Sequence, residues 1–274
     1  MPATHAAVLA GARIAVVLPS YNEARWIGET VSTLPAFVDE VIVVDDASMD
    51  DTGRRAIEAG RGRVSVVRHP RNRGVGAAIA TGYREARARG CDVIAVMAGD
   101  GQMHPDDLER VVRPVIDRSF DYVKGNRLRH PDVLGTMPFA RLAAGFALGW
   151  ITGVAIGEPG LSDSQCGFTA ISSRALDRLD LSALWPRYGY PNDLLGLVAR
   201  AGLAIGEVRV RPVYRGEASG VRAWHVGTVL FLVARAALRR ATGSEIGLRA
   251  EAPPREPPRR GDGASRLSDS LLSG

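Results

Sequence analysis

Short, continuous apolar runs alternate with longer amphipathic stretches through the first half of the chain. Four runs predict buried parallel strands, at residues 14–18, 41–44, 64–67 and 92–97. Segments with helical spacing accompany them, at residues 23–34, 50–59, 76–89 and 105–118. This alternation predicts an α/β fold, in which helices cover both faces of a mostly parallel sheet.

The regular alternation stops after residues 122–127. Residues 139–156 are apolar over about the minimum length for crossing a bilayer, yet they contain Arg141 and several glycines. Two interpretations of this segment therefore remain, a membrane-spanning helix and a helix at the surface or in the core of the domain. Residues 226–238 predict an amphipathic helix that either packs on the domain or brings its cationic end to anionic lipid headgroups.

The domain organisation follows from these patterns. A flexible N-terminus is expected over residues 1–12, and the Pro-, Arg-, Gly- and Ser-rich residues 241–274 predict a disordered tail. One domain is expected between them, over residues 13–240. Its first half ends near residue 118, and residues 119–240 form the second half, including a short helix and a strand predicted at 194–200 and 204–210.

Composition narrows the class of protein. A chain of 274 residues that is 46% hydrophobic and 24% charged excludes global disorder, and two cysteines exclude a disulfide scaffold. The net charge is +5, and Lys124 is the only lysine among 35 cationic residues. Phosphorylated ligands or a membrane surface would suit this charge. Nucleic acid is not expected, because the arginines are scattered and no aromatic stacking platform is visible. Without a secretory signal, the chain is expected in the cytoplasm.

Acidic residues gather at the predicted strand ends. Ligands of parallel α/β sheets bind at this edge. The acids concerned are Glu23, Asp45, Asp46 and Asp100. Carboxylates on one rim repel each other unless a cation lies between them, and a hard divalent metal with a phosphorylated ligand would satisfy both the acids and neighbouring arginines. For Asp50, a helix cap is an equally good reading.

Several of these segments resemble the family-2 inverting glycosyltransferases. The motifs lie at residues 19–23, 45–52 and 100–105. A spaced signature accompanies them, at Asn72, Gly74, Gly76, Ala78 and Gly82. Within the family, the sequence is most similar to the dolichol-phosphate or polyprenyl-phosphate mannose synthase and glucosyltransferase group, over residues 13–222. The resemblance implies a GT-A fold, with a Rossmann-like sheet flanked by helices and a C-terminal acceptor-side region.

The same resemblance assigns roles to residues of this chain. Those implied around the nucleotide sugar are Pro19, Tyr21, Glu23, Asp45, Asp46, Ser48, Asp100 and Arg215. Asp100 matches the second acid of the family's Asp-x-Asp motif, and Gln102 matches a glutamine that completes the metal site, so Mg²⁺ or Mn²⁺ is the expected cofactor. The first acid of the motif is replaced here by Ala98.

For the acceptor, the resemblance points to Arg127 and Arg141. Paired guanidinium groups suit a phosphorylated acceptor, although Arg141 is equally readable as a surface charge. Arg215 lies in a glycine-flanked loop and would close on the diphosphate. Asp193 falls where relatives often carry an acid, and it is also readable as a helix cap. The implied catalytic set is Asp100, Asp193 and Arg215.

The predicted activity is inverting hexosyl transfer from a nucleotide sugar of the GDP-mannose or UDP-glucose type to a polyprenyl or dolichyl phosphate. Such a phosphate is ionised near neutrality and needs no general base. An alternative is transfer to a hydroxyl of a glycan or small-molecule natural product, which would require Asp193 or Asp163 as the base. A third is a catalytically inactive nucleotide-sugar-binding protein, suggested by Ala98. A lipid acceptor would place the enzyme peripherally at the inner face of the cell membrane.

Overall fold

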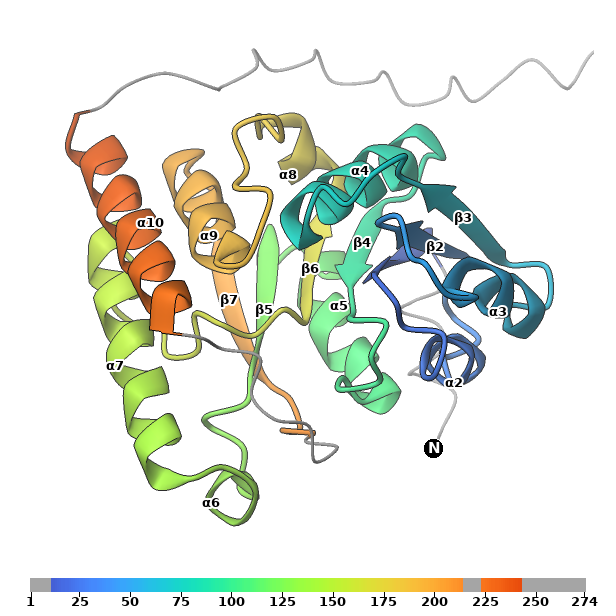
Figure 1. Ribbon diagram of the computed structural model, residues 1–274. Coiled ribbons are helices and arrows are strands. Elements are labelled where there is room, and N and C mark those ends of the chain that lie inside the picture. The colour runs from blue at the N-terminus through green and yellow to red at the C-terminus, as the bar shows by residue number, and fades with distance from the viewer. Residues whose placement is uncertain (1–10, 214–222, 243–274) are drawn as a thin grey trace, which may run out of the picture.

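A seven-stranded sheet runs through the molecule and carries helices on both faces (Figure 1). The computed structural model describes residues 11–213 and 223–242. The strands lie in the order β3-β2-β1-β4-β6-β5-β7. Their bounds are β1 (Ile14–Ser20), β2 (Glu40–Asp45), β3 (Val64–Arg68), β4 (Val93–Val96), β5 (Tyr122–Asn126), β6 (Thr169–Ser172) and β7 (Ile205–Arg209).

Strand β6 alone reverses direction within this sheet. It pairs antiparallel with β4 and with β5, whereas the other pairs are parallel. The four strands predicted in the first half are confirmed, and so is the strand predicted near 204–210. The reversal was not predicted. It matters for the site, because the segment that enters an antiparallel strand lies at the edge where the parallel strands end.

Ten helical segments lie around the sheet in the described residues. They are α2 (Ile27–Ser32), α3 (Thr52–Ala59), α4 (Val75–Ala88), the 3₁₀ turn η1 (Pro105–Asp107), α5 (Leu108–Ile116), α6 (Val133–Thr136), α7 (Phe139–Ile156), α8 (Ser173–Asp177), α9 (Tyr190–Arg200) and α10 (Ala223–Ala241). Helices α4, α8 and α9 cover one face, and α2, α3 and α5 cover the other. Helix α7 has the predicted bounds, and among the described helices it alone has the length and composition to cross a membrane.

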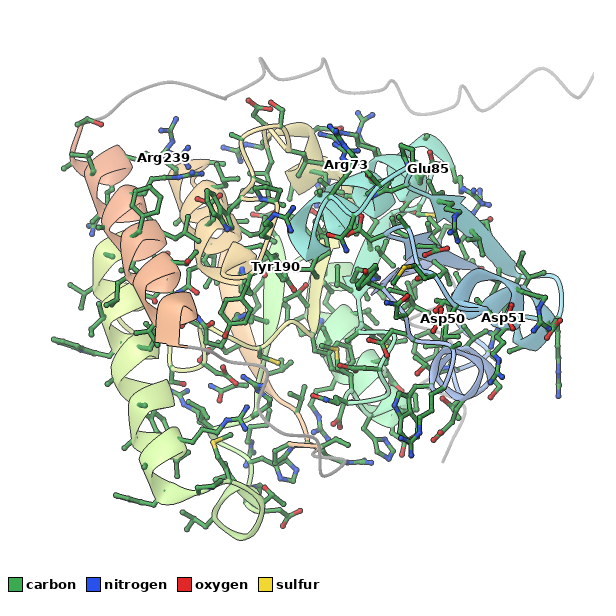
Figure 2. All side chains as sticks on the ribbon, in the orientation of Figure 1. Asp50, Asp51, Arg73, Glu85, Tyr190 and Arg239 are labelled. Atoms are coloured by element: carbon green, nitrogen blue, oxygen red, sulfur yellow. The ribbon has the colours of Figure 1, made fainter. Side chains whose placement is uncertain are left out.

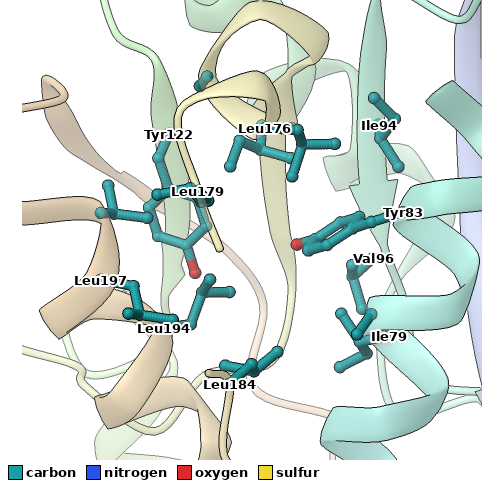
Figure 3. Close-up of a cluster of buried hydrophobic side chains, with 14 of the residues drawn as sticks. Ile79, Tyr83, Ile94, Val96, Tyr122, Leu176, Leu179, Leu184, Leu194 and Leu197 are labelled. Carbon is teal, nitrogen blue, oxygen red and sulfur yellow. The ribbon is translucent and has the colours of Figure 1, made fainter. Parts of the chain in front are cut away.

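Alternate residues of the central strands feed two hydrophobic cores. Ala15 and Val17 of β1 face the α4 side, whereas Val16 and Leu18 face the α5 side. This double burial explains why the strands read as continuous apolar runs. Figure 3 shows the α4 side, where side chains from α4, β4, β5, α8 and α9 meet.

The first predicted helix is shorter than expected. It begins at Ile27 and not at residue 23, and Asn22, which precedes the predicted start, has a φ of 57°. The Asn22 side chain instead accepts a hydrogen bond from the Met49 backbone, at 2.8 Å. Asparagine tolerates this left-handed conformation, so the residue closes a turn between two loops. The predicted N-terminal and C-terminal extensions fall largely on residues 1–10 and 243–274, outside the described residues.

Candidate active site

A cavity of about 340 Å³ opens where β1, β2 and β4 end. Five of the residues expected around a nucleotide sugar line it: Pro19, Tyr21, Glu23, Asp46 and Asp100. Its wall is completed by Asn72, Gly74, Ala78, Gly167 and Tyr190, among others. The sequence therefore located most of this first cavity, because strand ends of a parallel sheet converge.

Asp46 is fixed at the wall of the first cavity by the loop that follows β3. Its carboxylate accepts hydrogen bonds from the backbone N–H groups of Arg73 (2.8 Å) and Gly74 (2.7 Å). The ring nitrogen Nδ1 of the buried His69 lies 2.6 Å from the same carboxylate. With three partners on two oxygens, Asp46 holds the loop and the cavity wall in one arrangement.

Asp45 and Ser48, which are predicted beside the nucleotide, line neither this cavity nor the second one described below. Asp45 is buried, accepts a hydrogen bond from the Ser48 backbone at 2.8 Å and forms an ion pair with Arg68. The Ser48 hydroxyl accepts a hydrogen bond from the Asn22 backbone at 2.9 Å. Both residues therefore shape the turn that presents Asp46.

The spaced glycine signature has a packing reason. A Cβ on Gly76 would overlap the Trp185 carbonyl oxygen, and one on Gly82 would overlap the Val17 side chain. Gly74 has a φ of 95°, which favours glycine, and a Cβ there would also collide with the Pro186 carbonyl. These glycines let α4 approach β1 and the segment before α9, which closes the first cavity.

A second cavity of about 80 Å³ adjoins the first and is lined by three arginines. Ala98, Asp100, Met103 and Gly167 line both cavities. The arginines are Arg127, Arg141 and Arg211, and Gln102 lines this cavity as well. The structure thus brings Arg127 and Arg141 together as expected, next to Asp100.

Arg211 was not predicted from the sequence. It follows β7, which runs parallel to β5, so its position at the same edge of the sheet is the signal that was available. Its guanidinium lies 2.9 Å from the His104 ring and 3.3 Å from the Asp106 carboxylate. These contacts hold a third cation at the second cavity.

The segment before β6 is anchored by a buried polar network. Asp163 accepts hydrogen bonds from Nε and Nη2 of Arg127, at 2.9 and 3.1 Å. Glu207 of β7 accepts from the backbone N–H groups of Ser162 and Asp163. Burial alone would raise the pKa of Asp163, but the charges of Arg127 and Lys124 and the hydrogen bonds from Arg127 hold it below its usual value.

Lys124, the only lysine of the chain, lies inside this network. Its side chain is fully buried, and Nζ donates a hydrogen bond to the Cys166 carbonyl. Burial lowers the pKa of this ammonium group, against the attraction of nearby Asp163 and Glu207. The neighbouring Gly167 lines both cavities. Lys124 therefore supports the wall that the two cavities share.

Asp193 lies apart from both cavities. Its carboxylate is 1% exposed and forms ion pairs with Arg235 (2.8 Å) and Arg239 (3.4 Å) of α10. It also accepts a hydrogen bond from the Trp185 backbone. Figure 2 shows Arg239 on α10 at the outer flank, whereas Tyr190, which lines the first cavity, lies near the centre. The structure thus gives Asp193 the partners of a residue that fastens α10 to α9, and the helix cap is Gly189.

The metal site expected at Asp100 and Gln102 offers few protein ligands. Among the described residues, no group of three or more His, Cys, Asp or Glu could hold a metal ion. Asp100 accepts a hydrogen bond from the Gln102 backbone at 2.9 Å, and Ala98 beside them lines both cavities. One carboxylate and one amide oxygen fit Mg²⁺ or Mn²⁺ when substrate phosphates supply further ligands. Arg215, the predicted diphosphate cation, lies outside the described residues.

Comparisons with known proteins agree with this geometry. Residues 15–180 match the family described as "Glycosyl transferase family 2". The UDP-N-acetylglucosamine–dolichyl-phosphate N-acetylglucosaminyltransferase of Methanococcus voltae is 32% identical over 216 residues, covering 73% of this chain and 86% of that protein. The undecaprenyl-phosphate mannosyltransferase of Micrococcus luteus is 32% identical over 210 residues, covering 74% and 84%.

A similar solved structure is the glucosyl-3-phosphoglycerate synthase of M. tuberculosis. It matches with a TM-score of 0.61 and 27% identity, over 85% of this chain and 83% of that one. Crystals of the same enzyme with Mn²⁺, UDP and phosphoglyceric acid give a TM-score of 0.63 at 24% identity, over 88% of this chain and 83% of that one. These neighbours have the GT-A fold, and the mixed sheet described above is that fold.

Proposed function

The chain belongs to glycosyl transferase family 2 and is a glycosyltransferase, and from this premise we propose that it transfers a hexose from a GDP- or UDP-activated sugar to a polyprenyl or dolichyl phosphate. The observation that carries the proposal is the arginine-lined second cavity, which adjoins the first at Asp100. The relatives named above for dolichyl and undecaprenyl phosphate support a lipid phosphate as the acceptor.

The first cavity suits the donor. Tyr21 presents a partly exposed ring at its edge, and the anchored Asp46 offers a carboxylate to a nucleoside. The second cavity suits an anionic acceptor, because Arg127, Arg141 and Arg211 line it and guanidinium groups bind phosphate oxygens well. The sugar to be moved would then lie between the cavities, near Ala98 and Gly167.

The proposed reaction is a single displacement with inversion. An oxygen of the acceptor phosphate forms a bond to the anomeric carbon, while the bond from that carbon to the diphosphate breaks and the nucleoside diphosphate leaves with the electron pair. A phosphate monoester has a second pKa of about 6, so its oxygen is already ionised near neutrality. No proton has to be removed, which agrees with the position of Asp193 away from both cavities.

Asp100 and Gln102 are the residues of this chain that would hold a divalent cation. Mn²⁺ or Mg²⁺ accompanies UDP in crystals of the structural neighbour. Such an ion would offset the charge of the departing diphosphate. Arg215, which precedes α10 in the sequence, is proposed to assist.

Transfer of radiolabel tests the proposal. The protein is incubated with GDP-mannose, UDP-glucose or UDP-N-acetylglucosamine, with and without undecaprenyl phosphate, in Mg²⁺ or Mn²⁺. We expect label in the organic phase with one of these donors, only when the lipid phosphate is present. Label that enters only a water-soluble glycan or small molecule would support a hydroxyl acceptor instead. Intact donor binding with neither transfer nor hydrolysis would support an inactive binding protein.

A lipid acceptor places the enzyme at a membrane. We propose peripheral contact with the inner face of the cell membrane, where nucleotide sugars are available. The relatives named for lipid phosphates and the apolar helix α7 support this location. Fractionation of cells that express the full chain, with and without a high-salt wash, measures it.

A further inference from the structure

The carboxylate of Asp46 has nearly all of its hydrogen-bonding capacity used inside the protein. An ionised carboxylate offers about four acceptor positions, two on each oxygen. Oδ1 accepts from the backbone N–H of Arg73 at 2.8 Å and lies 2.6 Å from Nδ1 of His69, and Oδ2 accepts from the backbone N–H of Gly74 at 2.7 Å. Among the described residues these are its partners, so one acceptor position remains, and it belongs to Oδ2.

His69 determines which oxygen keeps the remaining position. A carboxylate only accepts hydrogen bonds, so Nδ1 of His69 carries the proton of this contact. The other ring nitrogen, Nε2, lies 3.0 Å from the hydroxyl oxygen of Thr81 on α4, which holds the ring from its opposite side. The side chains of Asp46 and His69 are only 4% and 5% exposed, so little water competes for these contacts. Turning the carboxylate to present both oxygens to the first cavity would break these buried hydrogen bonds.

A single free acceptor distinguishes the edges of the nucleobases. Uracil has one N–H group, at its N3 atom, between two carbonyl oxygens. Guanine has two neighbouring N–H donors, at its N1 atom and its exocyclic amine, which together match both oxygens of one carboxylate. In the first cavity the second donor of guanine would face an oxygen of Asp46 that already has two partners. A donor left unpaired in a site that binds through hydrogen bonds weakens binding.

We propose that His69 makes the first cavity selective for uridine, because it leaves Asp46 with one free acceptor at the cavity wall. This inference rests on the proposed function, in which Asp46 contacts the nucleoside of the donor. It narrows the donor from GDP- or UDP-activated sugars to the UDP type. His69 does not line the cavity, so it is a positioning residue that acts through Asp46.

Binding of nucleoside diphosphates to the full wild-type chain tests the selectivity directly. Calorimetric titration in Mg²⁺ compares UDP with GDP and with 3-methyl-UDP, in which a methyl group replaces the N3 hydrogen. We expect UDP to bind at least about tenfold more tightly than either, because GDP carries a second donor and 3-methyl-UDP has none at this atom. Inosine diphosphate, which is GDP without the exocyclic amine, should bind more tightly than GDP. If GDP or 3-methyl-UDP binds as tightly as UDP, the proposal is overturned.

Two amide variants of His69 test its positioning role. His69→Asn places an N–H donor near the position of Nδ1 and should keep the ratio of GDP to UDP dissociation constants within about twofold of the wild type. His69→Gln extends its amide toward Thr81 and loses the contact with Asp46, so this ratio should fall by about fivefold or more. An unchanged ratio in His69→Gln would remove His69 from the selectivity.

The matched control is His130→Gln. The His130 ring also lies beside a carboxylate, with Nδ1 3.6 Å from Asp132, and the residue lines neither cavity. This variant should bind both nucleotides like the wild type. In transfer assays the donor KM of His69→Gln should rise by a larger factor than kcat changes, because the nucleobase is not the reacting group. A loss confined to kcat would contradict a role in base recognition.

The failure of this selectivity is distinguishable from failure of the proposed function. If neither UDP nor GDP binds in Mg²⁺ or Mn²⁺, the first cavity is not a donor site, and the proposed function fails together with the inference. If GDP binds more tightly than UDP and label from GDP-mannose enters undecaprenyl phosphate, the selectivity is wrong and the proposed function stands. Label that enters the lipid from UDP-glucose or UDP-N-acetylglucosamine, and not from GDP-mannose, supports both.

Discussion

Arg127 and Asp163 form a bidentate pair at the edge of the second cavity. Nε of Arg127 lies 2.9 Å from Oδ2 of Asp163, and Nη2 lies 3.1 Å from Oδ1. The Arg127 backbone N–H also donates to Oδ2, at 3.1 Å. Since the carboxylate is buried and fixed by the backbone of residues 165 and 166, it sets the plane of the guanidinium that lines the cavity.

Replacing Arg127 by lysine should weaken use of the phosphate acceptor. Lysine keeps the charge but lacks the planar guanidinium that can donate two parallel hydrogen bonds. We therefore expect kcat/KM for polyprenyl phosphate to fall by about 10- to 100-fold, which corresponds to a loss of about 1.4 to 3 kcal/mol of transition-state stabilisation. Initial rates at varied acceptor concentration measure it, with donor KM as the internal reference. Arg129→Lys is the matched control, because the Arg129 side chain donates to the Gly160 carbonyl at 3.3 Å and the residue lines neither cavity. Unchanged acceptor kinetics in Arg127→Lys would remove Arg127 from the acceptor site.

Asp193→Asn should leave transfer to a lipid phosphate within about twofold of the wild type, because the carboxylate lines neither cavity and an ionised phosphate needs no base. Burial raises the pKa of Asp193, so Arg235 and Arg239 do not fully offset the desolvation of its carboxylate. The amide would nevertheless leave both partly buried arginines without their counter-charge, so we expect the free energy of unfolding to fall by about 2 kcal/mol or more. Steady-state rates and urea unfolding provide the two readouts. A loss of kcat by orders of magnitude in a fully folded variant would make Asp193 the general base of a hydroxyl transfer.

The different fates of Asp46 and Asp193 show how far sequence reasoning reaches. Asp46 directly follows β2, and parallel strands bring the residues at their carboxyl ends to one edge, so the local sequence pattern was sufficient to place it. The partners of Asp193 lie 42 and 46 residues further along the chain, on a helix whose packing no local pattern encodes.

The direction of β6 and the burial of Lys124 could not be predicted from the sequence, for a related reason. A strand of four residues carries no sign of whether its neighbours run parallel to it, because the path of the preceding loop decides this. Lysine is ordinarily a surface residue, and its enclosure depends on a network drawn from β5, β7 and the loop before β6. Its isolation among 34 arginines was visible in the sequence, but the reason for it was not.

Ala98→Asp should tighten the binding of Mn²⁺ in the presence of the donor diphosphate. Ala98 lines both cavities beside Asp100, so a carboxylate there adds a hard oxygen ligand to a site with one acid. We expect the metal concentration for half-maximal donor binding to fall by about tenfold or more, whereas Asp100→Asn should raise it by a similar factor. Calorimetric titration of nucleoside diphosphate at several Mn²⁺ concentrations measures both. Asp106→Asn is the control, because Asp106 is an exposed acid that lies close to Asp100 in the sequence. If the nucleoside diphosphate binds independently of the metal in the wild type and all three variants, an ion at Asp100 is excluded.

Stability in acid should depend on Asp163 and Asp193 with opposite signs. The pKa of Asp163 is lowered in the folded protein, so its contribution is present above the unfolded-state pKa of about 3.9 and is lost as the pH falls through the folded value. The pKa of Asp193 is raised, so its contribution is present in acid and is lost as the pH rises through the folded value. Between about pH 6 and pH 3, Asp163→Asn should flatten the fall in unfolding free energy and Asp193→Asn should steepen it. Urea unfolding at each pH tests this, and parallel curves for all three proteins would contradict it.

Lys124→Met should show that Lys124 affects substrate binding, through the cavity wall, more than it affects the stability of the fold. Methionine fills a similar volume without a charge, so the variant avoids the desolvation cost of the ammonium group but loses its attraction to Asp163 and Glu207. These effects oppose each other, and we expect the melting temperature to change by no more than about 5 °C. The Cys166 carbonyl, however, loses its donor, and the adjoining Gly167 lines both cavities. We therefore expect KM to rise for donor and acceptor together, by about three- to tenfold each, with a smaller change in kcat. Thermal unfolding and initial rates measure the two effects. An increase in the acceptor KM alone would place the role of Lys124 in its charge near Arg127 and Asp163, and not in the wall that both substrates share.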